Sequence, residues 1–221
     1  MKYHHILYEV DGNIARITLN RPKCLNAINA GLGRELQDAV ARANADEDVH
    51  VIILSGSGKG FCSGWDLKEY AEKPGYNPGF QKHPWDPTID FKMMKANTDA
   101  FMSFWRSYKP TICQLHGCAV GGGSDLALCC DIVVMAENAT IGMAELTSQF
   151  ICLGYPPARV WGCPTTAMWV YRIGAEKAKR MLLTGDVING IEAKALGLVT
   201  VYTYDMDNGL MVDRMLSLLR S

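Results

Sequence analysis

The sequence predicts an α/β fold in which strands alternate with helices. Two observations carry this prediction. Short β-branched apolar runs recur along the first two thirds of the chain, and stretches with apolar residues at helical spacing separate them. A strand, a helix and a second strand in that order form a parallel βαβ unit, so we expect a largely parallel sheet. With 221 residues, the chain is long enough for one substantial core and short for two ordinary domains.

The first elements in this pattern are a hairpin, a helix and a strand. Apolar runs at 6–10 and 14–19 flank Asp11-Gly12-Asn13, which is typical of a hairpin turn. Residues 30–45 carry apolar side chains three or four positions apart, which predicts a helix. Residues 50–54 then form a candidate for a buried strand.

The middle of the chain begins with a predicted loop. After Asp66 the sequence is expected to be irregular, because proline and glycine are dense between residues 70 and 87. Helical periodicity returns over residues 88–108, and Lys109-Pro110 ends it. Residues 111–115 then read as another strand.

Later elements continue the alternation and then change character. Residues 121–127 are expected to begin a helix directly after the strand at 111–115, followed by a strand at 132–135 and a short extended stretch at 139–142. From Thr165 onward the pattern is mostly helical.

Charge and hydropathy exclude several classes of protein. The chain has 22 Lys and Arg against 23 Asp and Glu, a formal net charge of −1, and it has no basic block. We therefore expect no nucleic-acid partner, and small molecules or other subunits instead. We expect no signal peptide and no membrane span, since no apolar run reaches about 20 residues, and we expect a cytoplasmic protein.

The eight cysteines do not form a metal or disulfide pattern. No C-x-x-C pair occurs and no Cys/His cluster has the spacing of a zinc site, so we expect no metal. Several of the cysteines lie inside apolar runs, which favours buried free thiols in a reducing compartment.

Two glycine-bearing segments are the candidates for a functional site. The first runs from Gly58 to Lys68 and the second from His116 to Asp125, and each follows a β-branched run. Backbone N–H groups at Gly121-Gly122-Gly123 would open a helix and would suit an anion or a developing oxyanion. Close helix packing explains these glycines equally well. Neither segment has the spacing of a phosphate-binding loop or of a dinucleotide fingerprint.

Two acidic residues follow the second segment. Asp125 falls in the first turn of the predicted helix, beside the glycine N–H groups, and Glu145 follows the next predicted strand. Both could transfer protons. Two alternatives stay open: Asp125 could simply stabilise the helix dipole, and Glu145 could be a solvated loop carboxylate.

Five blocks in order and in register give the chain a resemblance to the crotonase (enoyl-CoA hydratase/isomerase) superfamily. The blocks are Asn20-Arg-Pro-Lys-Cys-Leu-Asn-Ala-Ile28, Gly60-Phe-Cys-Ser-Gly-Trp-Asp-Leu-Lys-Glu69, Lys109–Ala127, Cys130-Asp-Ile-Val-Val134 and Leu183–Val199. The resemblance covers nearly the whole chain. It implies a crotonase fold of ββα units over residues 1–164 and a helical C-terminal region over 165–221, shorter than in relatives.

The resemblance also implies a set of site residues. The two donors of the family's oxyanion hole correspond to the backbone N–H groups of Trp65 and Gly122, and the Trp65 side chain should narrow the acyl pocket. Residues that match the walls of the family's CoA cleft are Lys23, Cys24, Leu25, Cys62, Gly64, Asp66, Leu67 and Lys68. No cofactor beyond the CoA moiety of the substrate is implied.

The acidic positions decide which reaction the resemblance implies. Family hydratases carry glutamates at the positions of Asp125 and Glu145, so Glu145 is expected to be the principal acid/base and Asp125 to assist or position water. The resemblance therefore predicts a 2-enoyl-CoA hydratase first. An enoyl-CoA isomerase, another enolate-forming reaction, and a CoA-thioester-binding protein with little catalysis stay open because Asp is one methylene shorter than Glu.

Two further features concern the pocket and the assembly. The segment 151–164 is bulky where family members often carry a segment rich in proline and glycine, and its Arg159 could contact a polar acyl group or a neighbouring subunit. The resemblance implies a homotrimer or a dimer of trimers.

Overall fold

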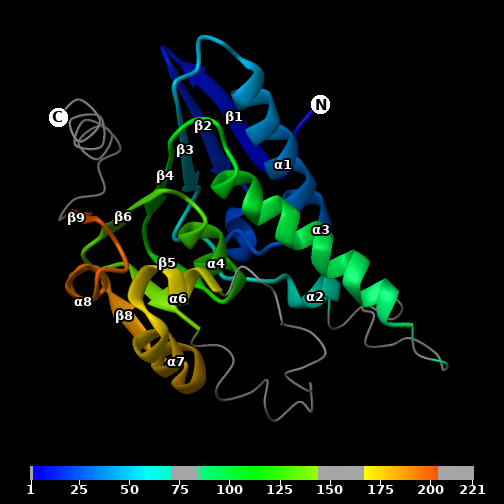
Figure 1. Ribbon diagram of the computed structural model, residues 1–221. Coiled ribbons are helices and arrows are strands. Elements are labelled where there is room, and N and C mark those ends of the chain that lie inside the picture. Colours follow the sequence, from blue (N-terminus) through cyan, green and yellow to red (C-terminus); the bar gives the residue numbers. More distant parts are fainter. Residues whose placement is uncertain (1, 71–83, 85, 144–166, 204–221) are drawn as a thin grey trace.

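A six-stranded sheet and a three-stranded sheet organise the chain. This computed structural model describes residues 2–70, 84, 86–143 and 167–203, drawn in colour in Figure 1. The large sheet has the order β1 (Ile6–Asp11), β2 (Ile14–Leu19), β3 (Val51–Gly56), β4 (Thr111–Leu115), β6 (Ile132–Ala136) and β9 (Val201–Thr203). The small sheet has the order β5 (Cys118–Val120), β7 (Thr140–Gly142) and β8 (Val187–Asn189).

The large sheet is parallel except at one edge. Strands β1 and β2 form an antiparallel hairpin across residues 11–14, whereas β2–β3, β3–β4, β4–β6 and β6–β9 are parallel pairs. The predicted hairpin and the predicted parallel units are both confirmed. Parallel strands need long crossover connections, which the helices between them supply.

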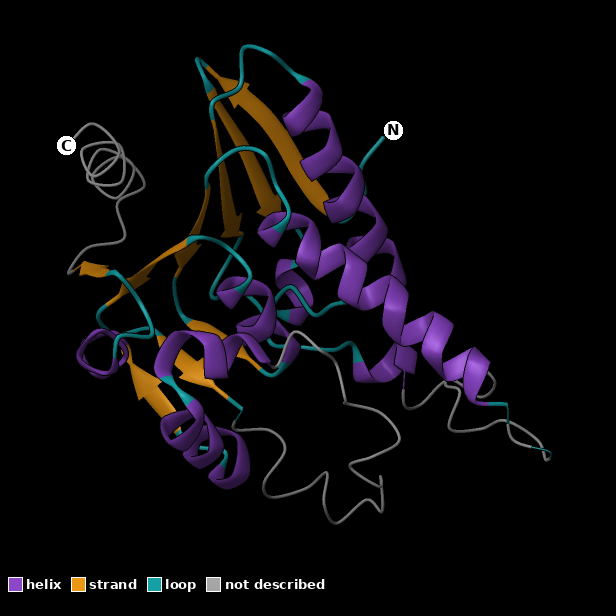
Figure 2. Cartoon of the chain, viewed as in Figure 1, coloured by secondary structure: helices purple, strands orange, loops and turns teal. Residues whose placement is uncertain are grey.

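The helices lie between these strands in the sequence. They are α1 (Ala30–Ala45), α2 (Leu67–Tyr70), α3 (Pro87–Trp105), α4 (Gly122–Leu128), α6 (Ala167–Ile173), α7 (Ala175–Thr184) and α8 (Gly190–Leu196), with a 3₁₀ turn η1 at Pro22–Cys24. In Figure 2, α1 runs along β1 and β2 of the large sheet, α3 runs beside α1, and α6, α7 and α8 gather around the small sheet.

Helix α1 shows why the sequence folds as it does. The Asn29 side chain caps its first turn by accepting the backbone N–H of Leu32 at 2.8 Å. Leu32, Leu36 and Val40, which recur at helical spacing, are all buried on the face that meets the core. The predicted bounds of this helix, 30–45, match the structure.

Several short elements differ from the sequence-based expectation. Residues 67–70 form α2, where we expected irregular chain, and β5 separates β4 from α4, which we expected to be adjacent. Described residues 167–203 form α6, α7 and α8, and they also contain β8 and β9, each of which joins a sheet. Strands of three residues are too short to show a period in the sequence. The expected boundary at residue 164 lies outside the described residues.

The core is continuous between the large sheet and the helices. Its largest buried side chains include Phe61, Phe101, Phe104 and Trp169, which come from segments far apart in the sequence. Among the described helices, none is long and apolar enough to cross a membrane.

Candidate functional site

The first glycine loop, residues 60–66, follows β3 and runs beside β5. Cys62 donates its N–H to the Cys118 carbonyl at 3.0 Å, and Val120 donates to the Cys62 carbonyl at 3.0 Å. These bonds make the loop a short parallel partner of β5. Because β5 lies within the second glycine loop, the pairing brings the two glycine loops together.

The residues just before α1 hold the other side of the first loop. Ile28 donates its N–H to the Gly64 carbonyl at 2.7 Å, and Asp66 donates to the Ile28 carbonyl at 2.8 Å. Trp65, which lies between these two bonds, therefore has a fixed backbone.

The second glycine loop, residues 117–123, ends at the first turn of α4. Gly121 has φ +53°, a conformation that favours glycine, and donates its N–H to the Gly142 carbonyl of β7 at 3.0 Å. The Ser124 hydroxyl donates to the Gly121 carbonyl at 2.7 Å. Gly122 is the first residue of α4, where an N–H has no acceptor within its own helix.

The two loops approach each other so closely that glycine is required at the contact. A Cβ on Gly64, which has φ +93°, would lie 2.8 Å from the Val120 carbonyl oxygen and 3.5 Å from the Gly122 nitrogen. A Cβ on Gly123 would lie 2.9 Å from the Cβ of Cys62. The structure thus brings together the loops that carry Trp65 and Gly122, as the sequence predicts.

The side chain of Trp65 lies between the two loops and the core. Its ring stacks on Phe101 of α3 with centroids 5.5 Å apart and planes at 17°. A Cβ on Gly122 would lie 2.9 Å from the indole Nε1, so the indole edge covers this glycine. The narrowing of an acyl pocket by Trp65 stays a prediction.

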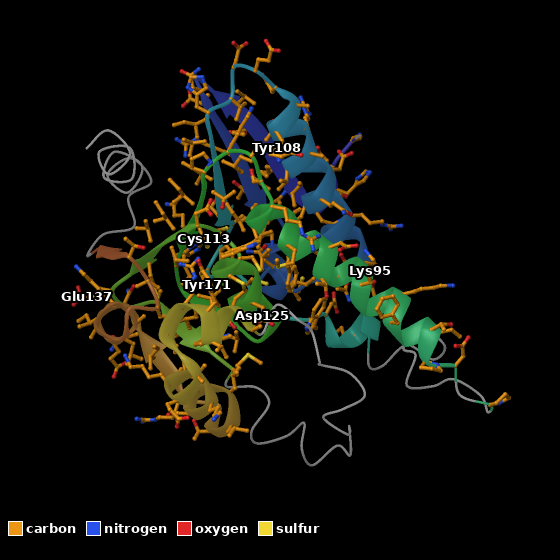
Figure 3. All side chains as sticks on the ribbon, viewed as in Figure 1. Lys95, Tyr108, Cys113, Asp125, Glu137 and Tyr171 are labelled. Atoms are coloured by element: carbon orange, nitrogen blue, oxygen red, sulfur yellow. The ribbon has the colours of Figure 1, made fainter. Side chains whose placement is uncertain are left out.

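Asp125 occupies the first turn of α4, one turn after the glycines. Asp125 is 4% exposed, and its backbone N–H donates to the Gly121 carbonyl at 3.2 Å. Figure 3 labels the position of Asp125. The Asp125 carboxyl is therefore buried close in sequence to the second loop. Glu145 and Arg159 lie outside the described residues.

Asn26 holds the first loop in place, a role that sequence reasoning missed. Its buried side-chain amide donates to the carbonyls of Ser57, Gly60 and Phe61 at 2.9 to 3.0 Å and accepts the backbone N–H of Arg21 at 2.8 Å. Its φ of +57° is tolerated by asparagine more readily than by most residues. The only sequence signal was its place in the block Asn20–Ile28.

The Arg21 side chain adds a second clamp on the same loop. Its guanidinium pairs with the Asp66 carboxylate at 2.7 Å and donates to the Ala27 carbonyl. The Asp66 carboxylate, which the resemblance placed at the CoA cleft, is thus engaged in an ion pair within the protein. It positions the end of the first loop.

The other predicted CoA-cleft residues divide into surface and interior positions. Lys23, Cys24 and Leu25 follow one another on η1 and at its end and are exposed, and Lys68 on α2 is also exposed. The exposed ammonium groups of Lys23 and Lys68 are therefore accessible to an anionic ligand.

Cys62 and Gly64, by contrast, are buried. Burial raises the pKa of the Cys62 thiol to about 12, and its sulfur lies 3.2 Å from the Asn26 carbonyl oxygen. Cys62 therefore contributes its backbone and not a reactive thiolate. The placement of the Leu67 side chain is not described.

Other candidate chemistry is limited in the part of the chain that the structure describes. Within those residues, no group of three or more His, Cys, Asp or Glu side chains is placed to hold a metal ion. A separate cavity of about 310 Å³ lies among α7, β8 and α8, and none of the predicted site residues lines it.

Comparison with known proteins assigns the chain to a family. The model of the enoyl-CoA hydratase/isomerase family matches residues 9–206. The chain therefore belongs to the enoyl-CoA hydratase/isomerase family, the crotonase superfamily, and the predicted crotonase fold is confirmed.

Individual relatives agree with this assignment. A probable enoyl-CoA hydratase from Rhizobium meliloti is 34% identical over 90% of this chain and 69% of its own length, and a crotonyl-CoA hydratase from Syntrophomonas wolfei has the same identity and coverage. A probable mitochondrial enoyl-CoA hydratase from Dictyostelium discoideum is 34% identical, and the chain spans 61% of its length. The crystal structure of an enoyl-CoA hydratase from Mycobacterium smegmatis superposes with a TM-score of 0.81 at 39% identity, covering 98% of this chain and 71% of that one.

Proposed function

We propose that this protein is a 2-enoyl-CoA hydratase that adds water across the C2–C3 double bond of an acyl-CoA thioester. The observation that carries the proposal is the meeting of the two glycine loops beside the buried Asp125, in a chain that belongs to the enoyl-CoA hydratase/isomerase family. Relatives named as enoyl-CoA hydratases, at 34% to 39% identity, support it.

The thioester carbonyl oxygen is held by two backbone donors, the N–H groups of Trp65 and Gly122. Water attacks C3 while a carboxylate takes one of its protons, and the π electrons of the double bond move onto the carbonyl oxygen as an enolate. Proton delivery to C2 then restores the thioester. Donors aimed at the place where negative charge develops are each worth about 3 kcal/mol.

Glu145 is the principal acid/base in this proposal, and Asp125 positions the water or shares the proton transfers. The burial of Asp125 in the first turn of α4, three residues after Gly122, supports this role. General acid/base catalysis by one carboxyl contributes about 10²-fold to 10⁴-fold. The reaction uses no group beyond the CoA moiety of the substrate.

The CoA moiety is proposed to lie along the exposed turn at Lys23, Cys24 and Leu25, with Lys68 opposite. The exposure of these residues and the two positive charges suit the phosphates of CoA. The clamp of Asn26 and Arg21 links this turn to the first loop, so the proposed CoA and carbonyl sites are joined by direct contacts.

An assay of crotonyl-CoA hydration tests the proposal. The reaction is monitored by the loss of the enoyl absorbance. We expect turnover by the wild type and a loss of at least about 100-fold in kcat for Glu145→Gln and for Asp125→Asn. The matched control is Glu47→Gln, a change at an exposed glutamate beyond the end of α1, which should leave kcat unchanged. Undiminished turnover in Glu145→Gln would remove that residue from its role.

Two other outcomes point to other functions. Exchange of the C2 proton with deuterated solvent without hydration would indicate an isomerase or another enolate-forming reaction. Binding of acyl-CoA without any chemistry across a substrate panel would indicate a binding protein.

The assembly and the compartment are also proposed. We expect a homotrimer or a dimer of trimers, which sedimentation of the purified protein measures directly. A cytoplasmic location is supported by the six described cysteines, all of which are free thiols.

A further inference from the structure

The indole of Trp65 is fixed against both the core and the second glycine loop. One face stacks on Phe101, which is fully buried in α3, and the edge carrying Nε1 and Cε2 lies against Gly122. Ile28 borders the same place, since its Cδ1 would lie 3.4 Å from a Cβ on Gly122. Residues Ile28, Trp65, Phe101 and Gly122 are called the Trp65 cluster below.

The Trp65 cluster is rigid from both ends. The backbone of Trp65 is bracketed by hydrogen bonds from Ile28 to Gly64 and from Asp66 to Ile28, and the Asp66 carboxylate is paired with Arg21. The ring itself is held by its stack on a side chain with no exposed surface. An aromatic ring held in this way forms a wall, because moving it aside would break its stack on Phe101.

The position of the Trp65 indole determines which acyl atoms have limited space. In the proposed function the carbonyl oxygen lies at the N–H groups of Trp65 and Gly122, and C2 is only two bonds from that oxygen. Carbon C2 and its substituents are therefore the acyl atoms next to an indole that covers Gly122. Atoms from C4 onward lie farther from it.

We propose that Trp65 selects acyl groups without a branch at C2, by excluding a methyl substituent at that carbon. The inference rests on the proposed function, because it takes the carbonyl position from it. Trp65 is half-buried, so part of its surface is open to a ligand. An added methyl group in a rigid, filled space is disfavoured by sterics, and one methylene in a tight pocket changes the specificity of enzymes by about 10-fold to 200-fold.

The test compares two pairs of thioesters that differ by a C2 branch. Rates are measured with crotonyl-CoA and 2-methylcrotonyl-CoA, and dissociation constants are measured by calorimetry with butanoyl-CoA and 2-methylbutanoyl-CoA, which cannot be hydrated. Wild-type protein should prefer the unbranched member of each pair. Trp65→Ala, which keeps the backbone N–H, should reduce the ratio of kcat/KM values by at least about tenfold and should reduce the binding ratio in the same direction.

Two further variants keep the result interpretable. Trp65→Leu fills more of the core and should give a smaller change in the same direction, so it serves if Trp65→Ala does not fold. Trp105→Ala removes a tryptophan of α3 that packs edge-on against Tyr171 at 4.9 Å, outside the Trp65 cluster, and should leave both ratios unchanged.

Failure of this inference differs from failure of the proposed function. Turnover of crotonyl-CoA with ratios that are the same in wild type and both Trp65 variants would overturn the inference alone. Absence of turnover together with a branch preference in binding that Trp65→Ala relaxes would overturn hydration alone and support the inference. A wild type that binds none of the thioesters would overturn both.

Discussion

The two glycine loops reach the same place by different means. Besides its backbone bonds, the first loop, residues 60–66, is held by side chains from elsewhere, namely the Asn26 amide and the Arg21 guanidinium. The second loop, residues 117–123, is held mainly through its backbone, by the bond from Gly121 to Gly142 of β7 and by close contact of Gly123 with Cys62. The first loop is therefore vulnerable to removal of a side chain, and the second to addition of one.

Adding a methyl group to the second loop should have the largest effect. Gly123→Ala would place a Cβ 2.9 Å from the Cys62 Cβ and closer still to its carbonyl oxygen, so the two loops must separate. We expect a loss of more than about 3 kcal/mol of stability in urea unfolding and loss of acyl-CoA binding. Gly33→Ala in α1 is the matched control, because its Cβ would lie 3.6 Å from Ala100 Cβ, an ordinary contact.

The Gly33→Ala control should change stability in the opposite direction. Gly33 lies inside a helix, where alanine is favoured, so Gly33→Ala should raise stability by about 0.5 to 1 kcal/mol. Equal stability in Gly123→Ala and the wild type would show that the loops are not in the close contact described above.

Removing a side chain from the first loop should have the next largest effect. Asn26→Ala leaves three carbonyls of residues 57, 60 and 61 without their donor and puts alanine at a φ of +57°. We expect a loss of about 2 to 3 kcal/mol in urea unfolding and a raised KM for acyl-CoA. Asn13→Ala removes an exposed side-chain bond to the Asp48 carbonyl and should cost less than about 1 kcal/mol, with no change in KM.

A change outside both loops should separate stability from activity. The buried Glu35 carboxylate accepts the backbone N–H groups of His4, His5 and Ile6 and lies 2.9 Å from His5 Nδ1. Glu35→Gln should cost about 2 kcal/mol in urea unfolding at pH 7 and leave kcat unchanged. A lower kcat at unchanged stability would place Glu35 in the functional machinery.

The pH dependence of this cost follows from the pKa of Glu35. Burial alone would raise that pKa, but the hydrogen bonds from His5 and His4 outweigh it and lower the pKa below its ordinary value. A carboxyl with a lowered folded pKa stabilises the protein above its unfolded pKa, about 4.3, and loses that contribution as pH falls through the folded pKa. The stability gap between wild type and Glu35→Gln should therefore close on acidification below pH 4.

The smallest expected effect is a difference in alkylation between the thiols of Cys62 and Cys24. Since burial raises the pKa of Cys62 to about 12, iodoacetamide at pH 8 should leave Cys62 unmodified while it alkylates the exposed Cys24. Peptide mass spectrometry measures both sites in one sample. Rapid modification of Cys62 in folded protein would contradict the tight contact of the first loop with β5.

Regular elements of the fold could be predicted because their signals are local. Helix 30–45 and strand 111–115 were predicted with the bounds that the structure shows, since each carries a period or an apolar run of its own. Strands β5, β8 and β9 have three residues each and exist because a neighbouring strand pairs with them. That pairing is a tertiary property, which the local sequence does not contain.

The candidate site was predicted by resemblance and only partly by chemistry. The sequence placed Trp65 and Gly122 on loops that the structure brings together, and Asp125 beside them. The roles of Asn26 and Phe101 depend on contacts with residues more than 30 positions away, so no local pattern could reveal them. Whether Trp65 and Gly122 donate to a substrate remains a prediction.

A crystal structure of the protein with butanoyl-CoA tests this central claim most directly. The account predicts that the thioester oxygen lies about 2.7 to 3.1 Å from the backbone nitrogens of both Trp65 and Gly122, with C2 facing the Trp65 indole. A thioester oxygen bound beyond hydrogen-bonding distance of either nitrogen would contradict it.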